Sequence, residues 1–119
     1  EGMEKTLTIL LNRGPFVSEY ADLAVRLALR AKEKGHQVNL YCYVDGVWAA
    51  HVKGEKPYEN VGHLLRKALE QGINVKVCAR CADARDISPQ DTIEGIPQVG
   101  LFDFIDWMKE SDKVVTFTG

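Results

Sequence analysis

The feature that most constrains the fold is the alternation of short apolar runs with longer amphipathic segments. Thr6 to Leu11 is an apolar run with β-branched members, and it ends at the turn residues Asn12 to Pro15. The following segment can be capped by Ser18 and has apolar residues at helical spacing, Leu27 among them. It closes at Gly35, a residue suited to the left-handed conformation that ends helices. This alternation predicts βαβ units and a parallel sheet covered by helices on both faces.

The alternation continues to the end of the chain. A second strand is expected over Gln37 to Val44, a second helix over Glu59 to Gln71, and a third strand that delivers Cys78 at its end. Two short helical segments are expected next, over Ala79–Arg85 and Ser88–Gly95. A last helix is marked by Leu101, Ile105 and Met108, and a last strand is expected over Lys113–Thr118.

A chain of 119 residues suits one domain, which buries roughly 65% of the surface that the unfolded chain exposes. The predicted fold class is therefore α/β, a single-domain sandwich with a mostly parallel β-sheet flanked by helices. Glu1 and Gly2 precede Met3 and indicate a tag remnant, so the domain is expected to span 3–119.

Composition disfavours several classes of protein. A hydrophobic fraction of 45% is ordinary for a globular domain, and no apolar run approaches the roughly 18 residues of a membrane span. The net charge of −2 disfavours direct nucleic-acid binding, which usually needs a basic excess. Three cysteines, without the layout of a signal peptide, indicate a reducing compartment and predict a cytoplasmic protein.

Charge is unevenly distributed along the chain. The segment from Lys53 to Arg85 holds seven basic and four acidic residues, whereas Asp86 to Asp112 holds seven acidic residues and one basic residue. Faces of opposite sign would favour docking onto another protein or a second copy of the chain. Two solvated faces explain the same counts.

Three loops follow predicted strands: Asn12–Val17, Asp45–His51 and Cys78–Ile87. Sites in open parallel sheets form at the carboxyl ends of the strands, so these loops are the candidate site.

Cys78 stands where a strand ends and a helix is expected to begin. Backbone N–H groups there, together with Arg80 and Arg85, would stabilise a thiolate, the form of cysteine that attacks or carries sulfur. A buried structural cysteine is the alternative interpretation, because free cysteines are among the most buried residues. Cys42, on the second predicted strand, is expected to fill the core.

Cys78 and Cys81 also form a C-x-x-C motif, in which a second thiol can resolve a mixed disulfide made by the first. The spacing equally suits half of a zinc site, but no second pair of ligands completes it, so no metal or other cofactor is expected. A thioredoxin-like arrangement would place the motif after an early strand, whereas here it follows the third.

Other candidates are weaker. Trp48 and His51 lie in a strand-end loop and could wall a cleft. Interior packing explains Trp48 at least as well. For His51, a solvent-facing or hydrogen-bonded side chain is a better explanation than a catalytic role. Asp45-Gly46 after a strand is more typical of a turn than of a catalytic carboxylate at Asp45. The chain has no G-x-G-x-x-G, P-loop or G-x-S-x-G motif.

With Cys78 at the end of the third strand, the chain resembles the DsrE/DsrF-like family, and within it the TusD/DsrE branch. The resemblance covers almost the whole length. It is carried by Asn12–Pro15, Gly35–Val38, Asp45–Trp48, Gly72–Cys78, Ala84–Arg85 and Asp112–Val115. The Asp-Gly-Val loop together with the strand-terminal cysteine is its most specific part.

The resemblance implies an intracellular sulfur relay, in which Cys78 carries a persulfide and passes it to a cysteine of a partner protein. Such relays serve tRNA thiolation or sulfur oxidation and reduction. It also implies assembly into homo- or heteromeric trimers or hexamers. Two positions depart from the family pattern: Asp86 stands where a glycine is common, and Cys81 lies outside the core motif, where it could resolve a persulfide on Cys78.

Three other classes remain open. A dithiol/disulfide oxidoreductase would use Cys78 and Cys81 together, and a non-catalytic assembly subunit would keep Cys78 buried and unreactive. A nucleotide-binding domain of similar architecture would show ligand-dependent thermal shifts, although no phosphate loop supports it.

Overall fold

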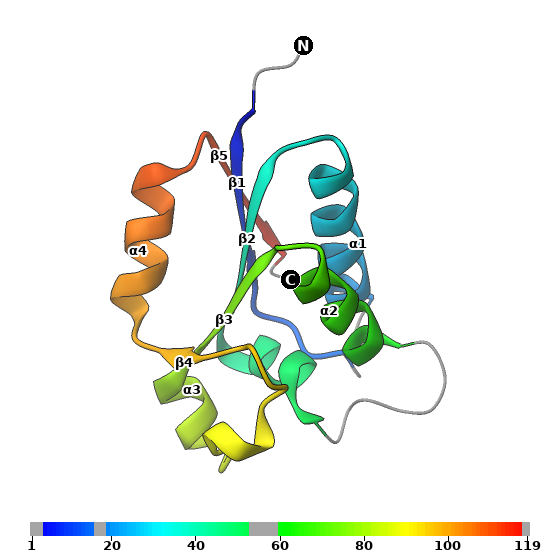
Figure 1. Cartoon of the computed structure of the whole chain (residues 1–119). Helices are drawn as coiled ribbons and strands as arrows, with labels where there is room; N and C mark the ends of the chain where they lie inside the picture. Colours follow the sequence, from blue (N-terminus) through cyan, green and yellow to red (C-terminus); the bar gives the residue numbers. More distant parts are fainter. Residues whose placement is uncertain (1–3, 16–18, 53–59, 118–119) are drawn as a thin grey trace.

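Every strand pair in the sheet is parallel, and the strand order is β4-β3-β2-β1-β5 (Figure 1). The structure is a computed structural model that describes residues 4–15, 19–52 and 60–117. Its strands are β1 (Thr6–Leu11), β2 (Gln37–Cys42), β3 (Asn74–Cys78), β4 (Gln98–Val99) and β5 (Lys113–Phe117). The single-domain α/β sandwich that the sequence predicts is therefore confirmed, with a parallel sheet.

The helices are divided between the two faces of the sheet. They are α1 (Tyr20–Glu33), α2 (Val61–Glu70), α3 (Ala79–Ala84) and α4 (Leu101–Glu110), with the 3₁₀ helices η1 (Val44–Ala50) and η3 (Pro89–Asp91). Figure 1 shows α1 and α2 on one side of the sheet and α4 on the other, with α3 near the ends of β3 and β4.

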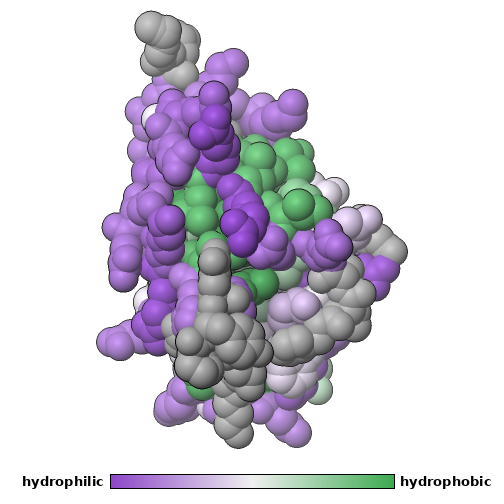
Figure 2. Space-filling model, turned by 90° about the vertical axis from the view of Figure 1, so that its right-hand side faces the viewer, coloured by the Kyte–Doolittle hydropathy of each residue, from purple (hydrophilic) through white to green (hydrophobic). Residues whose placement is uncertain are grey.

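The face beneath α1 and α2 is apolar and forms the main core. Buried strand residues on this face include Ile9, Leu40, Cys42 and Val77. Small alanines on α1 allow that helix to lie close to the strands. The outer surface of this side is mixed, with hydrophobic patches among hydrophilic groups (Figure 2). Leu23 and Leu27 of α1 are among its exposed apolar side chains.

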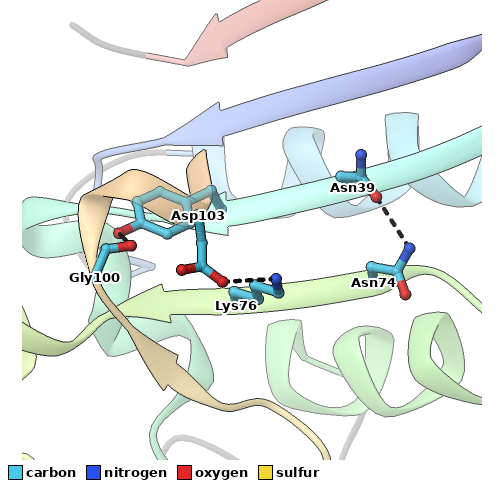
Figure 3. Close-up of polar contacts among 6 residues, drawn as sticks. Asn39, Asn74, Lys76, Gly100 and Asp103 are labelled. Atoms are coloured by element: carbon cyan, nitrogen blue, oxygen red, sulfur yellow. Dashed lines mark hydrogen bonds and ion pairs between the residues drawn. The ribbon is translucent and has the colours of Figure 1, made fainter. Parts of the chain in front are cut away.

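The face beneath α4 carries a row of polar side chains. The Asn39 amide donates to the Thr8 hydroxyl at 3.2 Å, and the Asn74 amide donates to the Asn39 carbonyl oxygen at 3.0 Å (Figure 3). The Thr8 hydroxyl also hydrogen-bonds that of Ser111, which follows α4. These pairings satisfy the buried polar groups and join three strands to the end of α4.

An ion pair holds the first turn of α4 to β3. The Lys76 ammonium lies 3.0 Å from the Asp103 carboxylate (Figure 3) and 4.6 Å from the centre of the Trp107 ring. Trp107 and Phe104 are the buried side chains of α4, and both pack in a cluster with Tyr41 and Cys78. The helix is thus anchored directly beside the end of β3.

Several sequence-based boundaries were wrong. The second strand ends at Cys42 rather than Val44, because Val44 has a φ of 53° and begins η1 where a loop was expected. The helical turn after Ser88 stops at Asp91 rather than Gly95, and the two-residue strand β4 was not predicted.

The predicted apolar markers of two helices also differ from the buried ones. In α4, Leu101 and Met108 are exposed, whereas Phe104 and Trp107 are buried. In α1, Leu27 is at the surface. Of the remaining expectations, a helix cap at Ser18 falls outside the described residues, as do Glu1 and Gly2.

Candidate functional site

Cys78 is both the last residue of β3 and the residue that caps α3. Its sulfur accepts a hydrogen bond from the Cys81 backbone N–H at 3.4 Å. The chain turns from strand to helix at this point, so the sulfur lies at the carboxyl end of the sheet, as the sequence predicts. Neighbouring strands β2 and β4 lead into η1 and α4, which approach the same edge.

A cavity of about 560 Å³ opens between α3 and the start of α4. Its walls are mostly apolar, and they are formed by Tyr43, Cys78, Ala79, Arg80, Cys81, Gly100, Leu101, Phe102 and Ile105. Only 4% of Cys78 is exposed, so this cavity is its route to another molecule. Both cysteines of the C-x-x-C motif contribute to the wall.

Hydrogen bonds around the Cys78 sulfur favour the thiolate. Burial raises the pKa of Cys78, but the neighbouring donors outweigh burial and leave the pKa below its ordinary value. The donors are the backbone N–H groups of Cys81 and Arg80, the Cys81 thiol and the Tyr41 hydroxyl. A buried sulfur with these donors differs from an inert structural cysteine.

Cys42 provides the contrast within the same chain. It is fully buried on the opposite face of the sheet, and burial alone raises the pKa of its thiol to about 12. The expectation that Cys42 fills the core is confirmed.

Tyr41 is a site residue that sequence reasoning missed. It is completely buried, and burial followed by the adjacent Cys78 raises its pKa far above the ordinary value, so the hydroxyl keeps its proton. The same hydroxyl lies 3.4 Å from the Gly100 carbonyl oxygen. A hydroxyl has one proton to donate, and a thiolate is a stronger acceptor than a carbonyl at that distance. Tyr41 is therefore a positioning residue for the anionic form of Cys78.

Tyr41→Phe should raise the pKa of Cys78 and slow its alkylation. One hydrogen bond to a charged group contributes about 1.5 kcal/mol, so we expect the rate at neutral pH to fall about tenfold or somewhat less. The difference should vanish at a pH high enough to ionise both proteins fully. The measurement is the pH profile of iodoacetamide labelling, located by peptide mass spectrometry.

The variant retains the ring that stacks on Phe104 at 5.1 Å, so the fold should be preserved. An unchanged pH profile would contradict the role assigned to the hydroxyl.

The structure separates the four predicted supporting residues. Arg80 lines the cavity with an exposed side chain. The Arg85 guanidinium instead pairs with the Asp45 carboxylate at 2.9 Å and donates to the Cys81 carbonyl oxygen at 3.0 Å. Trp48 and His51 stack on each other at 5.6 Å and do not line the cavity.

The cavity walls contributed by α4 were also missed. Phe102 and Ile105 lie far from Cys78 in the sequence, and nothing local links them to it. A weak signal existed for the tyrosines, because Asn39, Tyr41 and Tyr43 alternate with apolar residues along the second strand. That alternation indicates that the tyrosines lie on the opposite face of the strand from the apolar residues, but it does not indicate which helix or strand packs against either face.

Two kinds of feature are absent from the described part of the chain. The helices within residues 4–15, 19–52 and 60–117 are too short or too polar to span a lipid bilayer. Within the same ranges, no group of three or more His, Cys, Asp or Glu side chains is arranged to hold a metal ion.

Comparison with known proteins gives consistent matches over nearly the whole chain. The model of the DsrE/DsrF-like family matches residues 5–117. An uncharacterized protein of Methanopyrus kandleri is 38% identical, over 98% of this chain and 97% of its own. Protein YchN of Escherichia coli is 33% identical, over 93% of this chain and 97% of its own.

Solved structures agree with these matches. The crystal structure of YchN from Escherichia coli superposes with a TM-score of 0.84 at 34% identity, covering 97% of this chain and all of that chain. A protein of unknown function from Methanobacterium thermoautotrophicum gives a TM-score of 0.73 at 14% identity over 96% of this chain and all of that one, which indicates a shared fold.

Proposed function

The chain belongs to the DsrE/DsrF-like family, and on that premise we propose that it is a sulfurtransferase-type relay protein. Cys78 accepts a sulfane sulfur as a persulfide and passes it to a cysteine of a partner protein. The observation that carries this proposal is the Cys78 sulfur, which lies at an apolar cavity and receives hydrogen bonds that favour its thiolate.

The relay consists of two exchange reactions at sulfur. In the first, the Cys78 thiolate attacks the outer sulfur of a donor persulfide, a new S–S bond forms, and the donor thiolate leaves. In the second, an acceptor thiolate attacks the outer sulfur on Cys78, which leaves as a thiolate. Neither step changes the total oxidation state, so no external oxidant or reductant is needed.

The site supports both steps through its donors. The N–H groups of Arg80 and Cys81, with the Tyr41 hydroxyl, stabilise Cys78 as the attacking and as the leaving thiolate. The cavity of about 560 Å³ has room for the outer sulfur, and its apolar wall limits the access of water. The exposed Arg80 at its edge is suited to attract an anionic persulfide.

Protein partners are supported by the surface around the cavity. Phe102 is 80% exposed and Leu101 is 43% exposed, although both line the cavity that leads to Cys78. Exposed apolar side chains at the mouth of a site are typical of surfaces that contact another polypeptide. We infer that the donor, the acceptor or another subunit of a trimer or hexamer covers this edge, in the reducing environment of the cytoplasm.

Loading of the wild-type protein tests the proposal. The reduced protein is incubated with a limiting amount of glutathione persulfide, desalted and examined by intact mass spectrometry. We expect a gain of one sulfur atom, which a thiol acceptor added afterwards removes. Prior alkylation of Cys78 should prevent the gain. If the untreated protein neither gains sulfur nor releases sulfide, the relay proposal is wrong.

A second candidate is a dithiol/disulfide oxidoreductase. The placement of the two cysteines favours it, because the Cys81 backbone N–H lies 3.4 Å from the Cys78 sulfur and both residues line the same cavity. Such a protein would lose the mass of two hydrogens under mild oxidation and would show no sulfur gain at any stage of the loading experiment.

A further inference from the structure

Cys81 has partners of its own at the cavity wall. Burial and the neighbouring Cys78 raise the pKa of the Cys81 thiol, while the Val44 backbone N–H and the positive charge of Arg85 act in the opposite direction. The Arg85 guanidinium also donates to the Cys81 carbonyl oxygen at 3.0 Å. Cys81 is thus a partly exposed thiol that remains protonated beside a neighbouring thiolate, with groups in place to stabilise its anion.

The Val44 donor is supplied by an unusual piece of backbone. Val44 is β-branched and has a φ of 53°, a conformation that is strained for such a residue. Gly46, two residues on, packs directly against the Leu11 carbonyl oxygen, and Asp45 pairs with Arg85 at 2.9 Å. The start of η1 is therefore held against β1 and α3, with the Val44 N–H on the Cys81 sulfur.

We propose that Cys81 is a resolving thiol that discharges a persulfide from Cys78 as hydrosulfide. The inference rests on the proposed function, because it begins with the persulfide on Cys78. It adds a second outcome to the relay: sulfur that no acceptor collects leaves as hydrosulfide, and the protein is left with a Cys78–Cys81 disulfide.

The reaction balances without an external oxidant. The Cys81 sulfur attacks the inner sulfur of the Cys78 persulfide, a Cys78–Cys81 bond forms, and the bond to the outer sulfur breaks. The proton of the Cys81 thiol leaves with the outer sulfur, which departs as hydrosulfide. The outer sulfur is reduced and the two cysteines are oxidised, so a dithiol reductant must reopen the disulfide before the next cycle.

The spacing of the two cysteines permits this bond. Cys78 caps α3 and Cys81 is the third residue of that six-residue helix, so both lie at its first turn. The Cys81 backbone N–H already lies 3.4 Å from the Cys78 sulfur. In a C-x-x-C pair the second thiol can reach the first, and the disulfide brings their Cβ atoms to about 3.5–4.5 Å.

Comparison of the wild type with Cys81→Ser tests the inference. Both proteins are loaded with glutathione persulfide, desalted and incubated without an acceptor, while free sulfide and intact mass are followed over time. We expect Cys81→Ser to keep its extra sulfur at least about tenfold longer, because a positioned intramolecular thiol raises the effective concentration of the attacking group by orders of magnitude. The wild type should release one sulfide per chain and end at the mass of the reduced protein less two hydrogens.

Each result leads to a different conclusion. If the wild type and Cys81→Ser load and keep sulfur equally long, the resolving role of Cys81 is wrong and the relay stands. If neither protein gains sulfur and no sulfide is released, the relay itself is wrong. The wild-type time course decides the matter alone should Cys81→Ser fail to fold, because the disulfide and the released sulfide are both read directly from it.

Discussion

Cys78→Ser should abolish sulfur loading, with a fall of at least about a hundredfold in the rate at which the protein gains sulfur from glutathione persulfide. A serine hydroxyl at neutral pH is protonated and is a poor nucleophile without an adjacent base, so the donors that stabilise the thiolate have no equivalent anion to act on. Intact mass spectrometry of the loaded and desalted protein measures the effect.

Cys42→Ala is the matched control for that experiment. Cys42 lies in the core on the other face of the sheet, so its removal should cost some stability and leave loading at the wild-type rate. A Cys78→Ser protein that still loads at the wild-type rate would place the reactive sulfur on Cys81 and overturn the assignment of the carrier.

Gly46→Ala should destabilise the protein by about 3 kcal/mol or more and lower its melting temperature by roughly 10 °C or more. A Cβ atom at this position would lie 2.1 Å from the carbonyl oxygen of Leu11 and 2.8 Å from its carbonyl carbon. Both atoms belong to the backbone of a central strand, which cannot move aside as a flexible side chain can. Thermal or urea unfolding followed by circular dichroism gives the change in free energy.

Gly35→Ala is the matched control for the glycine variant. Gly35 has a φ of 93°, and a Cβ there meets nothing within 4 Å. The alanine should therefore lower the free energy of unfolding by only about 1 kcal/mol, through backbone strain. Equal destabilisation by the two substitutions would contradict the steric explanation. If Gly46→Ala folds well enough to load sulfur, its Cys81 should also be less reactive toward alkylation, because η1 supplies the Val44 N–H that stabilises the Cys81 thiolate.

The sequence by itself predicted the alternating elements, the parallel sheet and the placement of Cys78 at a strand end. These depend on local patterns: β-branched apolar runs, helical spacing and glycine stops are read within ten or fifteen residues. The first strand, Thr6–Leu11, was predicted with the bounds that the structure has. The cysteine pair is likewise local, since only two residues lie between its members.

Only the tertiary structure decided which distant groups meet Cys78. Tyr41 reaches it because β2 and β3 are adjacent in the sheet, and the sequence does not contain the strand order. Phe102 and Ile105 reach the cavity because the ion pair between Lys76 and Asp103 and the burial of Trp107 set the rotation of α4.

Arg85 shows that nearness in the sequence also fails to predict a contact. Its position near Cys78 in the sequence suggested a contact with the thiolate, but the side chain pairs with Asp45, forty residues earlier. A charged side chain pairs with an opposite charge that the fold brings within reach, and which charge that is depends on long-range packing. The chemistry of the site was therefore predictable from the two cysteines, whereas its donors and its cavity depend on how strands and helices far apart in the chain pack together.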